Sequence, residues 1–330
     1  MTTRTTRHLV DPELATILDQ FPSMELTDET LQQLRAAMLS VRSQLLSNLP
    51  TFADIAVSEH VVPGPAGAPG VRVLCYVPTG VQGPLPALFW IHGGGYVLGA
   101  PEQDDLAVKT IVSSIGCAVV SVDYRLAPET PHPGPLEDCY AALVWLFTNA
   151  SELGVDPTRI AIGGGSAGGG LAAALGLLAR DRATVPLVFQ LLIFPMIDDR
   201  TVTTTDPHPY TGEFIWTAEA NRFGWTALLG QAPGGPDISP YAAAARAENL
   251  AGLPPTFINV GALDLFLEED LEYARRLMRA GVPTELHVYP GAYHGFTMAA
   301  DAQASQIARR DQLAALQRAF GHPAAAGKSR

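Results

Sequence analysis

The feature that most constrains this chain is one serine set among glycines between a predicted strand and a predicted helix. Residues 160–170 read Ile-Ala-Ile-Gly-Gly-Gly-Ser-Ala-Gly-Gly-Gly, and the helix formers of residues 171–175 follow them. A sharp turn at Ser166 leaves little room for neighbouring side chains, so glycine two residues before and two residues after the serine fits such a turn. A G-x-S-x-G pattern between a strand and a helix is the context of a nucleophilic serine.

The glycine-rich turn by itself also fits a phosphate-binding loop or a simple chain reversal. No Gly-Lys-Ser/Thr sequence follows it, however, and the G-x-G-x-x-G pattern that starts at Gly163 has Ser166 at its centre. The free N–H groups at the start of the next helix would point at the same spot as the serine hydroxyl. A serine nucleophile is therefore the favoured interpretation.

A second glycine cluster supplies hydrogen-bond donors for such a nucleophile. His92, Gly93, Gly94 and Gly95 follow another apolar run. Acyl transfer through a serine needs N–H groups that stabilise an oxyanion, and these come from a glycine loop and from the residue after the nucleophile, here Ala167. We expect His92 to hold this loop structurally, because it precedes the serine in the chain.

The remaining partners of a serine nucleophile are expected downstream, first an acid and then a histidine. Asp264 follows the predicted strand at residues 256–261, and His294 follows the one at residues 284–290. Both lie in loops on the sheet edge where Ser166 emerges. The histidine would take the hydroxyl proton and return it to the leaving group, while the aspartate would orient the imidazole.

Together these motifs resemble the hormone-sensitive-lipase-like family of α/β-hydrolases. The matching pieces are His92-Gly-Gly-Gly, Asp-Tyr-Arg-Leu-Ala-Pro-Glu at residues 123–129, the turn at Ser166, Asp264 and His-Gly-Phe at residues 294–296. They span residues from about 70 to 300 in the order and spacing of the family.

The chain departs from the family pattern at two points. Gly165 stands directly before the serine, where the family usually has aspartate, and Asp264 begins Asp-Leu-Phe rather than Asp-Pro-Leu. Three further acids, Glu268, Glu269 and Asp270, lie close to Asp264. We interpret them as the acidic first turn of a helix, where their negative charges interact favourably with the positive end of the helix dipole.

The resemblance implies a serine carboxylesterase that acts on small or short-to-medium-acyl esters through an acyl-enzyme intermediate. Ser166 would be the nucleophile, His294 the general base and then acid, and Asp264 the orienting carboxylate. No cofactor and no metal is expected. Two alternatives stay open: an amidase or lactonase with the same triad, and a receptor of the same fold that binds a small ligand without turnover. Such receptors lose the late histidine, which this chain keeps at His294.

Apolar runs that alternate with helical segments predict an α/β-hydrolase fold, with a mostly parallel sheet covered by helices on both faces and a helical cap. Strands are predicted at residues 54–62, 71–78, 86–91, 117–122, 159–163, 187–194, 256–261 and 284–290. The expected units are cap helices at 1–50, core at 51–198, a cap insertion at 199–246, core at 247–322 and a flexible tail at 323–330.

Two segments are candidates for the cap. Helices are predicted at residues 11–21 and 27–46, the second with Thr27 as N-cap. Its apolar stripe comprises Leu31, Leu34, Met38, Val41 and Leu45. The resemblance implies that such N-terminal helices cover the active site.

Aromatic residues of the predicted insertion are expected mostly to pack against the body, since aromatic side chains usually follow burial. Phe214 and Trp216 are the two we expect to contact substrate, together with Tyr96 beside the glycine loop. We expect Arg125 and Glu129 to form internal salt bridges or loop anchors rather than to bind substrate.

The formal net charge of −12 disfavours nucleic acid and anionic membrane surfaces as partners. No apolar run is long enough to span a bilayer, and no hydrophobic region follows the basic N-terminus. Cys75, Cys117 and Cys139 are scattered, which predicts buried thiols in a reducing compartment. We therefore expect a cytoplasmic protein whose partner is a small ester. Relatives that form homodimers make a homodimer one expectation for the oligomeric state.

Overall fold

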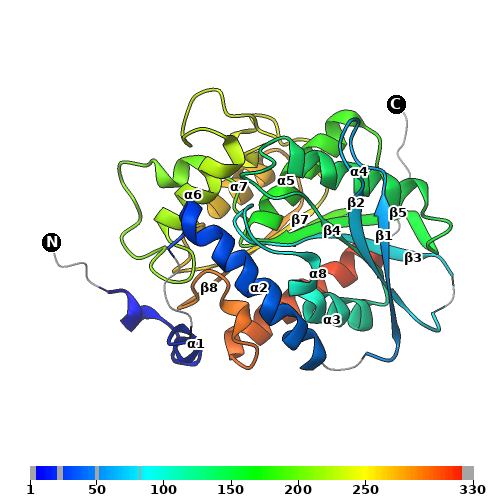
Figure 1. The fold of residues 1–330 in the computed structure, drawn as a ribbon, viewed down its shortest axis with the longest axis horizontal. Coiled ribbons are helices and arrows are strands. Elements are labelled where there is room, and N and C mark those ends of the chain that lie inside the picture. The colour runs from blue at the N-terminus through cyan, green and yellow to red at the C-terminus, as the bar shows by residue number, and fades with distance from the viewer. Residues whose placement is uncertain (1–4, 21–24, 49–51, 82, 322–330) are drawn as a thin grey trace.

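The computed structural model describes residues 5–20, 25–48, 52–81 and 83–321, without the side chains of residues 39–48. Its centre is an eight-stranded sheet with the strand order β1-β2-β4-β3-β5-β6-β7-β8 (Figure 1). In chain order the strands are β1 (Ile55–Val62), β2 (Val71–Pro78), β3 (Leu85–Ile91), β4 (Ala118–Asp123), β5 (Val155–Gly165), β6 (Phe189–Ile193), β7 (Thr256–Gly261) and β8 (Thr284–Tyr289). The predicted strands are all present, and the α/β-hydrolase fold is confirmed.

Helices connect most of these strands. The α-helices are α1 (Pro12–Leu18), α2 (Asp28–Asn48), α3 (Asp105–Ile115), α4 (Gly134–Thr148), α5 (Ala167–Arg182), α6 (Ala218–Leu229), α7 (Leu267–Arg279) and α8 (Gln303–Gly321). Short 3-10 helices are η1 (Arg7–Leu9), η2 (Pro101–Asp104), η3 (Asp199–Val202), η4 (Ala244–Arg246) and η5 (Phe296–Met298).

Strand β2 pairs antiparallel with both β1 and β4, and the remaining pairs from β4 to β8 are parallel. Strand β3 is buried along its whole length, as expected for a parallel strand covered on both faces. Because the strands from β3 to β8 run the same way, the loops after β3, β5, β6, β7 and β8 meet at one edge of the sheet.

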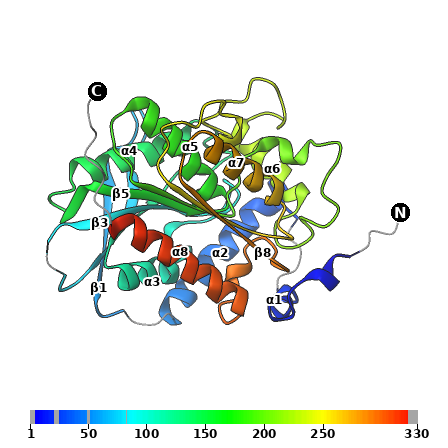
Figure 2. The same cartoon turned by 180° about the vertical axis from the view of Figure 1, so that it is seen from behind.

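Helices cover the sheet on both faces. Helices α3 and α8 lie on one face, and α4, α5 and α7 lie on the other (Figures 1 and 2). Side chains of β3 alternate between the two faces of the sheet. Phe89 and Ile91 belong to the apolar cluster that contains α4 and α5. Leu88 and Trp90 belong to the cluster that contains α3 and α8.

The predicted apolar stripe of α2 is only partly buried. Thr27 caps α2 as predicted, since its hydroxyl accepts a hydrogen bond from the Thr30 N–H at 3.2 Å. Leu31 is buried and Leu34 partly buried, but Met38 is exposed. The side chains of Val41 and Leu45 lie outside the described part of the chain.

The predicted insertion leaves the sheet after β6 and returns before β7, carrying η3, α6 and η4. Helix α6 stands at the centre of this segment. The predicted tail at 323–330 lies outside the described residues. Among the helices that are described, none combines the length and the apolar character needed to cross a bilayer. Cys75, Cys117 and Cys139 are buried free thiols, as expected.

Candidate active site

The predicted serine turn is formed at the end of β5. Ser166 adopts φ 56° and ψ −122°, and α5 begins at the next residue. A positive φ is uncommon for a residue with a side chain, and such strain collects at functional sites. The Ser166 N–H donates to the Ile193 carbonyl at 2.9 Å, which ties the turn to the end of β6.

Glycines around the serine allow close backbone approach. A Cβ on Gly164 would lie 2.5 Å from the Ile91 oxygen, and a Cβ on Gly168 would lie 2.1 Å from the same atom. Because that oxygen belongs to the end of β3, any side chain at either position would push β3 and its following loop away from the serine. The glycine spacing seen in the sequence is therefore a steric requirement of this turn.

The three predicted side chains meet in one hydrogen-bonded chain. Ser166 Oγ lies 2.9 Å from His294 Nε2, and His294 Nδ1 lies 2.9 Å from Asp264 Oδ2. Asp264 is fully buried, whereas His294 and Ser166 retain 6% and 9% exposure. A neutral imidazole that donates Nδ1–H to the carboxylate leaves Nε2 free to accept the serine proton.

Aromatic rings fix the imidazole on several sides. Phe194 and Phe266 present their rings edge-on to His294, each with ring centroids 5.0 Å apart, and Trp216 lies at 6.4 Å. Phe194 itself has a positive φ of 35°. Restricting the imidazole in this way keeps it aligned with Ser166 without further hydrogen bonds.

In the part of the chain that the structure describes, none of the three acidic residues that follow Asp264 forms a hydrogen bond or an ion pair with His294. Glu268 is exposed at the start of α7, whereas Glu269 accepts hydrogen bonds from the backbone N–H groups of Ile197 and Asp198. Asp264 instead accepts the Phe266 N–H at 3.0 Å through its second oxygen. The acidic cluster does form the first turn of a helix, as predicted, although Glu269 and Asp270 are buried within it.

The loop of Gly93, Gly94 and Gly95 lies against the serine turn. A Cβ on Gly93 would lie 2.8 Å from the Gly165 oxygen and 3.5 Å from the Ser166 Cβ, so the two backbones are in close contact. Gly94 and Gly95 have φ values of 120° and 60°. Ala167 is the first residue of α5, so its N–H has no acceptor within the helix. The loop and the helix start thus flank the serine with backbone donors.

Buried side chains hold the glycine loop. His92 is fully buried, its Nδ1 lies 2.8 Å from the Gly93 oxygen, and its ring stacks on Tyr124 at 4.3 Å. Burial lowers the pKa of His92 to about 4, so the ring is neutral at pH 7. The Tyr124 hydroxyl donates to the His92 carbonyl at 3.0 Å. These contacts support the structural role expected for His92.

Helix α2 adds a distant support. Arg35 donates from Nε to the Val97 carbonyl and from Nη2 to the Ala127 carbonyl, each at 2.8 Å. It also pairs with Glu129 at 2.7 Å, and Arg125 pairs with the buried Asp138 at 2.7 Å. Arg125 and Glu129 are therefore internal anchors, as predicted. Arg35 was not singled out by the sequence, because nothing along α2 marks a helix arginine as a support for a loop 62 residues away.

The three predicted substrate contacts are placed differently. Tyr96 is only 1% exposed, and its hydroxyl donates to the Met196 carbonyl at 2.7 Å, so it packs beneath the loop instead of facing substrate. Trp216 lies over the site, since a Cβ on Gly95 would be 2.1 Å from its ring. Phe214 packs near Tyr293, with ring centroids 6.1 Å apart. A substrate contact by Tyr96 stays a prediction, which its burial and its own positive φ of 67° do not favour.

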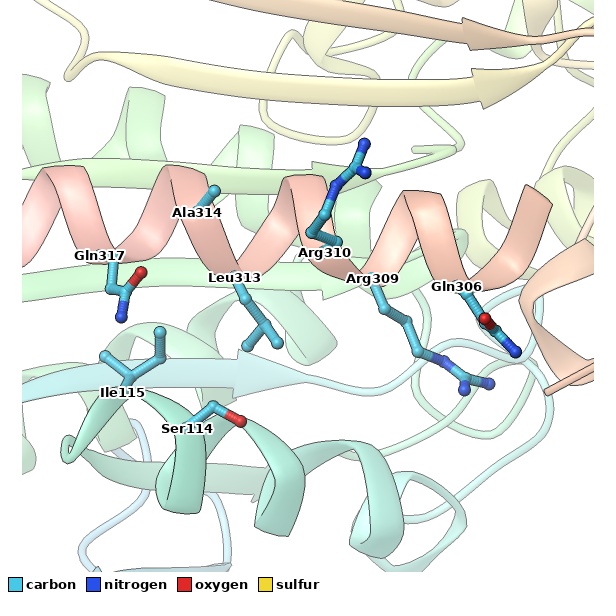
Figure 3. Close-up of a pocket in the computed structure, with 8 residues that line it drawn as sticks. All are labelled: Ser114, Ile115, Gln306, Arg309, Arg310, Leu313, Ala314 and Gln317. Carbon is cyan, nitrogen blue, oxygen red and sulfur yellow. The ribbon is translucent and has the colours of Figure 1, made fainter. Parts of the chain in front are cut away.

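A separate hollow lies between α3 and α8, and its lining residues come from positions 114–115 and 306–317. It has a volume of about 450 Å³ and is lined by residues such as Ile115, Arg309 and Leu313 (Figure 3). None of the predicted site residues lines it. Across the described ranges, no group of three or more His, Cys, Asp or Glu side chains is arranged to hold a metal ion.

Comparison with known proteins decides the family. A family model described as the alpha/beta hydrolase fold matches residues 88–298. The chain belongs to this family. The resemblance to its hormone-sensitive-lipase-like members is thereby confirmed.

Named relatives cover almost the whole chain. Carboxylesterase NlhH of Mycobacterium tuberculosis is 36% identical over 322 residues, which cover 94% of this chain and 96% of the relative. A solved bacterial heroin esterase has a TM-score of 0.90 at 41% identity and covers 96% of this chain and 99% of its own. Esterase LipW from Mycobacterium marinum has a TM-score of 0.85 at 37% identity, with 95% and 97% covered. These esterase relatives match almost the whole chain and confirm the predicted enzyme class, a carboxylesterase.

Proposed function

We propose that this protein is a serine carboxylesterase that hydrolyses small or short-to-medium-acyl esters. Ser166 attacks the ester carbonyl while His294 takes its proton, and His294 then protonates the leaving alcohol. Asp264 holds the imidazole tautomer and stabilises the imidazolium. Water then attacks the acyl-serine while His294 takes one of its protons, and His294 returns a proton to the Ser166 oxygen as the carboxylic acid leaves.

The observation that carries this proposal is the chain of two 2.9 Å hydrogen bonds from Ser166 through His294 to Asp264. The backbone N–H groups of Gly93, Gly94, Gly95 and Ala167 are the proposed oxyanion donors. A donor of this kind typically contributes about 3 kcal/mol to lowering the barrier.

We also propose that residues 1–50 and 199–246 act as the cap, with 51–198 and 247–322 as the hydrolase core. Support comes from contacts of both segments with the site: Arg35 of α2 binds the carbonyl of Val97, and Trp216 of the insertion lies on Gly95. A bounded cleft would favour acyl groups of about two to eight carbons, because burial of each fitting methylene adds up to about 0.8 kcal/mol.

A receptor without turnover is the less favoured alternative. The late histidine that such a receptor would lack is present and lies within hydrogen-bonding distance of the serine. Amide or lactone hydrolysis needs the same side chains, so substrate tests must separate them. A cytoplasmic location and a homodimer stay predictions from the sequence.

The test is a hydrolysis screen of p-nitrophenyl esters from acetate to palmitate, with anilides and lactones alongside. We expect the highest kcat/KM among the short and medium acyl esters and weak or no turnover of anilides. Ser166→Ala serves as the matched control for background hydrolysis. Equal turnover by wild type and this variant, or turnover of lactones alone, would contradict the proposal.

A further inference from the structure

We propose that Glu213 is a positioning residue of the esterase site. Its carboxylate binds the N-terminal segment at Thr5 and Thr6 and thereby clamps residues 212–216, which we call the bridging segment, across the loops of the site. The inference rests on the proposed ester hydrolysis and adds to it a support that is neither a triad member nor part of the glycine loop.

The bridging segment lies against the acid loop and the histidine turn. The Gly212 N–H donates to the Leu263 carbonyl at 3.1 Å, one residue before the proposed acid. A Cβ on Gly295, the residue after the proposed base, would lie 3.9 Å from Ile215 Cγ2. Five residues of the insertion therefore contact the loops of both partners of the serine.

Trp216 extends the bridging segment to the glycine loop. A Cβ on Gly95 would lie 2.1 Å from the Trp216 ring, and the indole N–H donates to Asn221 Oδ1 of α6 at 3.0 Å. The ring is thus fixed between α6 and the loop proposed to bind the oxyanion. A shift of the bridging segment would therefore reach both the proposed base and the proposed oxyanion donors.

The bridging segment holds a strained turn at Ile215. Ile215 has a φ of 64°, and the Trp216 N–H donates to the Phe214 carbonyl at 2.7 Å. This three-residue turn has the hydrogen bond of a γ-turn and the positive φ of its rare form. A β-branched residue seldom adopts a positive φ, so contacts on either side must hold the turn in this conformation.

Glu213 supplies the contact that comes directly before the strained turn. One carboxylate oxygen accepts the Thr5 hydroxyl at 2.6 Å, and the other accepts the backbone N–H and the hydroxyl of Thr6, each at 2.5 Å. Glu213 lies at the surface, but Thr6 is only 5% exposed. Hydrogen bonds to an ionised acceptor are stronger than neutral ones. A carboxylate, with two acceptor oxygens and a charge, therefore suits this position better than an amide.

The N-terminal segment is itself anchored to the loop after β8. The Asp11 N–H donates to the Gly291 carbonyl at 3.1 Å, and the Tyr293 hydroxyl donates to the Leu14 carbonyl at 3.0 Å. In both views of the fold, α1 lies beside the segment that follows β8 (Figures 1 and 2). The carboxylate clamp thus ties the bridging segment to a support that is fixed to the loop of the proposed base.

The test measures turnover of p-nitrophenyl butyrate per active serine, counted by fluorophosphonate titration. Glu213→Gln keeps the side-chain shape but loses the charge and one acceptor oxygen, so kcat should fall about fivefold while KM stays within about twofold. Thr6→Val, which keeps the backbone donor, should lower kcat about threefold. Glu219→Gln is the matched control, because Glu219 is an exposed acid of the same insertion, and it should leave kcat unchanged.

A second comparison asks whether the clamp acts through the strained turn. Glycine adopts a positive φ without strain, so in Ile215→Gly the turn no longer needs the clamp. Adding Glu213→Gln to Ile215→Gly should then lower kcat by no more than about twofold, against about fivefold in the wild-type chain.

Hydrogen exchange followed by mass spectrometry gives a readout apart from turnover. In Glu213→Gln, the amides of Gly212 and Trp216 should exchange about tenfold faster, because the bridging segment opens locally. The amides of α5 should keep their wild-type exchange rates, which shows that the fold as a whole is intact.

The outcomes separate this proposal from the proposed function. If the wild type hydrolyses no ester, the esterase activity fails and the role of Glu213 fails with it. If the wild type is active and Glu213→Gln matches the Glu219→Gln control in kcat, only the role of Glu213 is wrong. A rise in KM without a fall in kcat, an unchanged exchange of the bridging segment, or an equal loss of kcat in the Ile215→Gly chain would each contradict it as well.

Discussion

The proposed triad and the proposed oxyanion loop are held in place by different kinds of contact. Ser166, Asp264 and His294 stand in the turns directly after β5, β7 and β8, so the packed sheet fixes them. The oxyanion loop follows β3 but depends on side chains from distant parts of the chain, among them Arg35 on α2. Helix α6 approaches the same loop so closely that a Cβ on Gly224 would lie 2.7 Å from the Gly95 oxygen.

This difference predicts two grades of sensitivity to mutation. In the proposed mechanism a triad side chain takes part in bond making or proton transfer, so its loss removes a chemical step. A support of the oxyanion loop acts through geometry, so its loss should lower the rate partially and leave the mechanism in place.

The largest effect is expected at the nucleophile. Ser166→Ala should lower kcat by about 10⁶-fold, because no acyl-enzyme can form. Steady-state hydrolysis of p-nitrophenyl butyrate measures this. Turnover by the variant within a hundredfold of wild type would show that another residue attacks the ester.

The orienting acid should come next. Asp264→Asn should lower kcat by about 10⁴-fold, because an amide favours the wrong imidazole tautomer. Glu268→Gln is the matched control, since Glu268 is an exposed acid on the same loop and helix start. An inactive Glu268 variant beside an active Asp264 variant would mean that the acid has been misassigned.

A graded effect is expected for the support on α2. Arg35→Met removes the donors to the carbonyls of Val97 and Ala127 and frees the glycine loop. We expect kcat to fall about tenfold with little change in KM, because oxyanion contacts strengthen in the transition state.

Two further variants sharpen this comparison. Arg35→Lys should recover part of the loss, since a lysine restores one charged donor but not the fork of an arginine. Arg275→Met, which removes an exposed ion pair with Glu272, should have no effect on kcat. A rise in KM alone in Arg35→Met would assign the arginine to substrate binding instead of loop support.

The smallest effect concerns stability near the triad. Asp270 is fully buried, and burial raises its pKa well above the ordinary carboxyl range, with the neighbouring carboxyls of Glu269 and Asp264 adding to the shift. Above the ordinary carboxyl pKa, the folded state therefore holds a proton that the unfolded state releases. The free energy of unfolding should fall with rising pH by up to about 1.4 kcal/mol per pH unit for this group, until the raised pKa is passed.

Asp270→Asn should make that slope shallower, as measured by urea unfolding between pH 5 and pH 7, while the buried Glu269, whose pKa is also raised, keeps its own contribution. The Asn variant carries no titrating proton there, whatever its constant cost in stability. An unchanged slope would mean that Asp270 is ionised in the folded protein.

Features encoded in short stretches of sequence could be predicted, whereas features that depend on contacts between distant residues could not. The strands and the proposed triad residues could be predicted because each is encoded locally, as an apolar run followed by a turn that carries one reactive side chain. The burial of Tyr96 could not be predicted, because adjacency along the chain does not tell which way a side chain points, and Tyr96 itself has a positive φ of 67°. Phe194 and Arg35 were not recognised at all, since their roles arise from a strained backbone and from a contact across 62 residues.

The N-terminal helix shows the same limit. The predicted apolar stripe of α2 is buried at Leu31 and partly buried at Leu34, whereas Met38 is exposed. The charged Arg35, which lies outside the stripe, adds hydrogen bonds to the body. Helical spacing gives the side of a helix, but the partner on that side depends on how the whole chain packs. Helices α3 and α8 were likewise not identified from the pattern.

The most direct test of the central claim is covalent labelling of the full-length protein with a fluorophosphonate, followed by peptide mapping by mass spectrometry. We predict one adduct per chain, on Ser166, with labelling slowed by several orders of magnitude in His294→Ala, because the serine is then no longer deprotonated. An adduct on any other residue, or equally fast labelling without His294, would contradict the assignment of Ser166 and His294 as nucleophile and base.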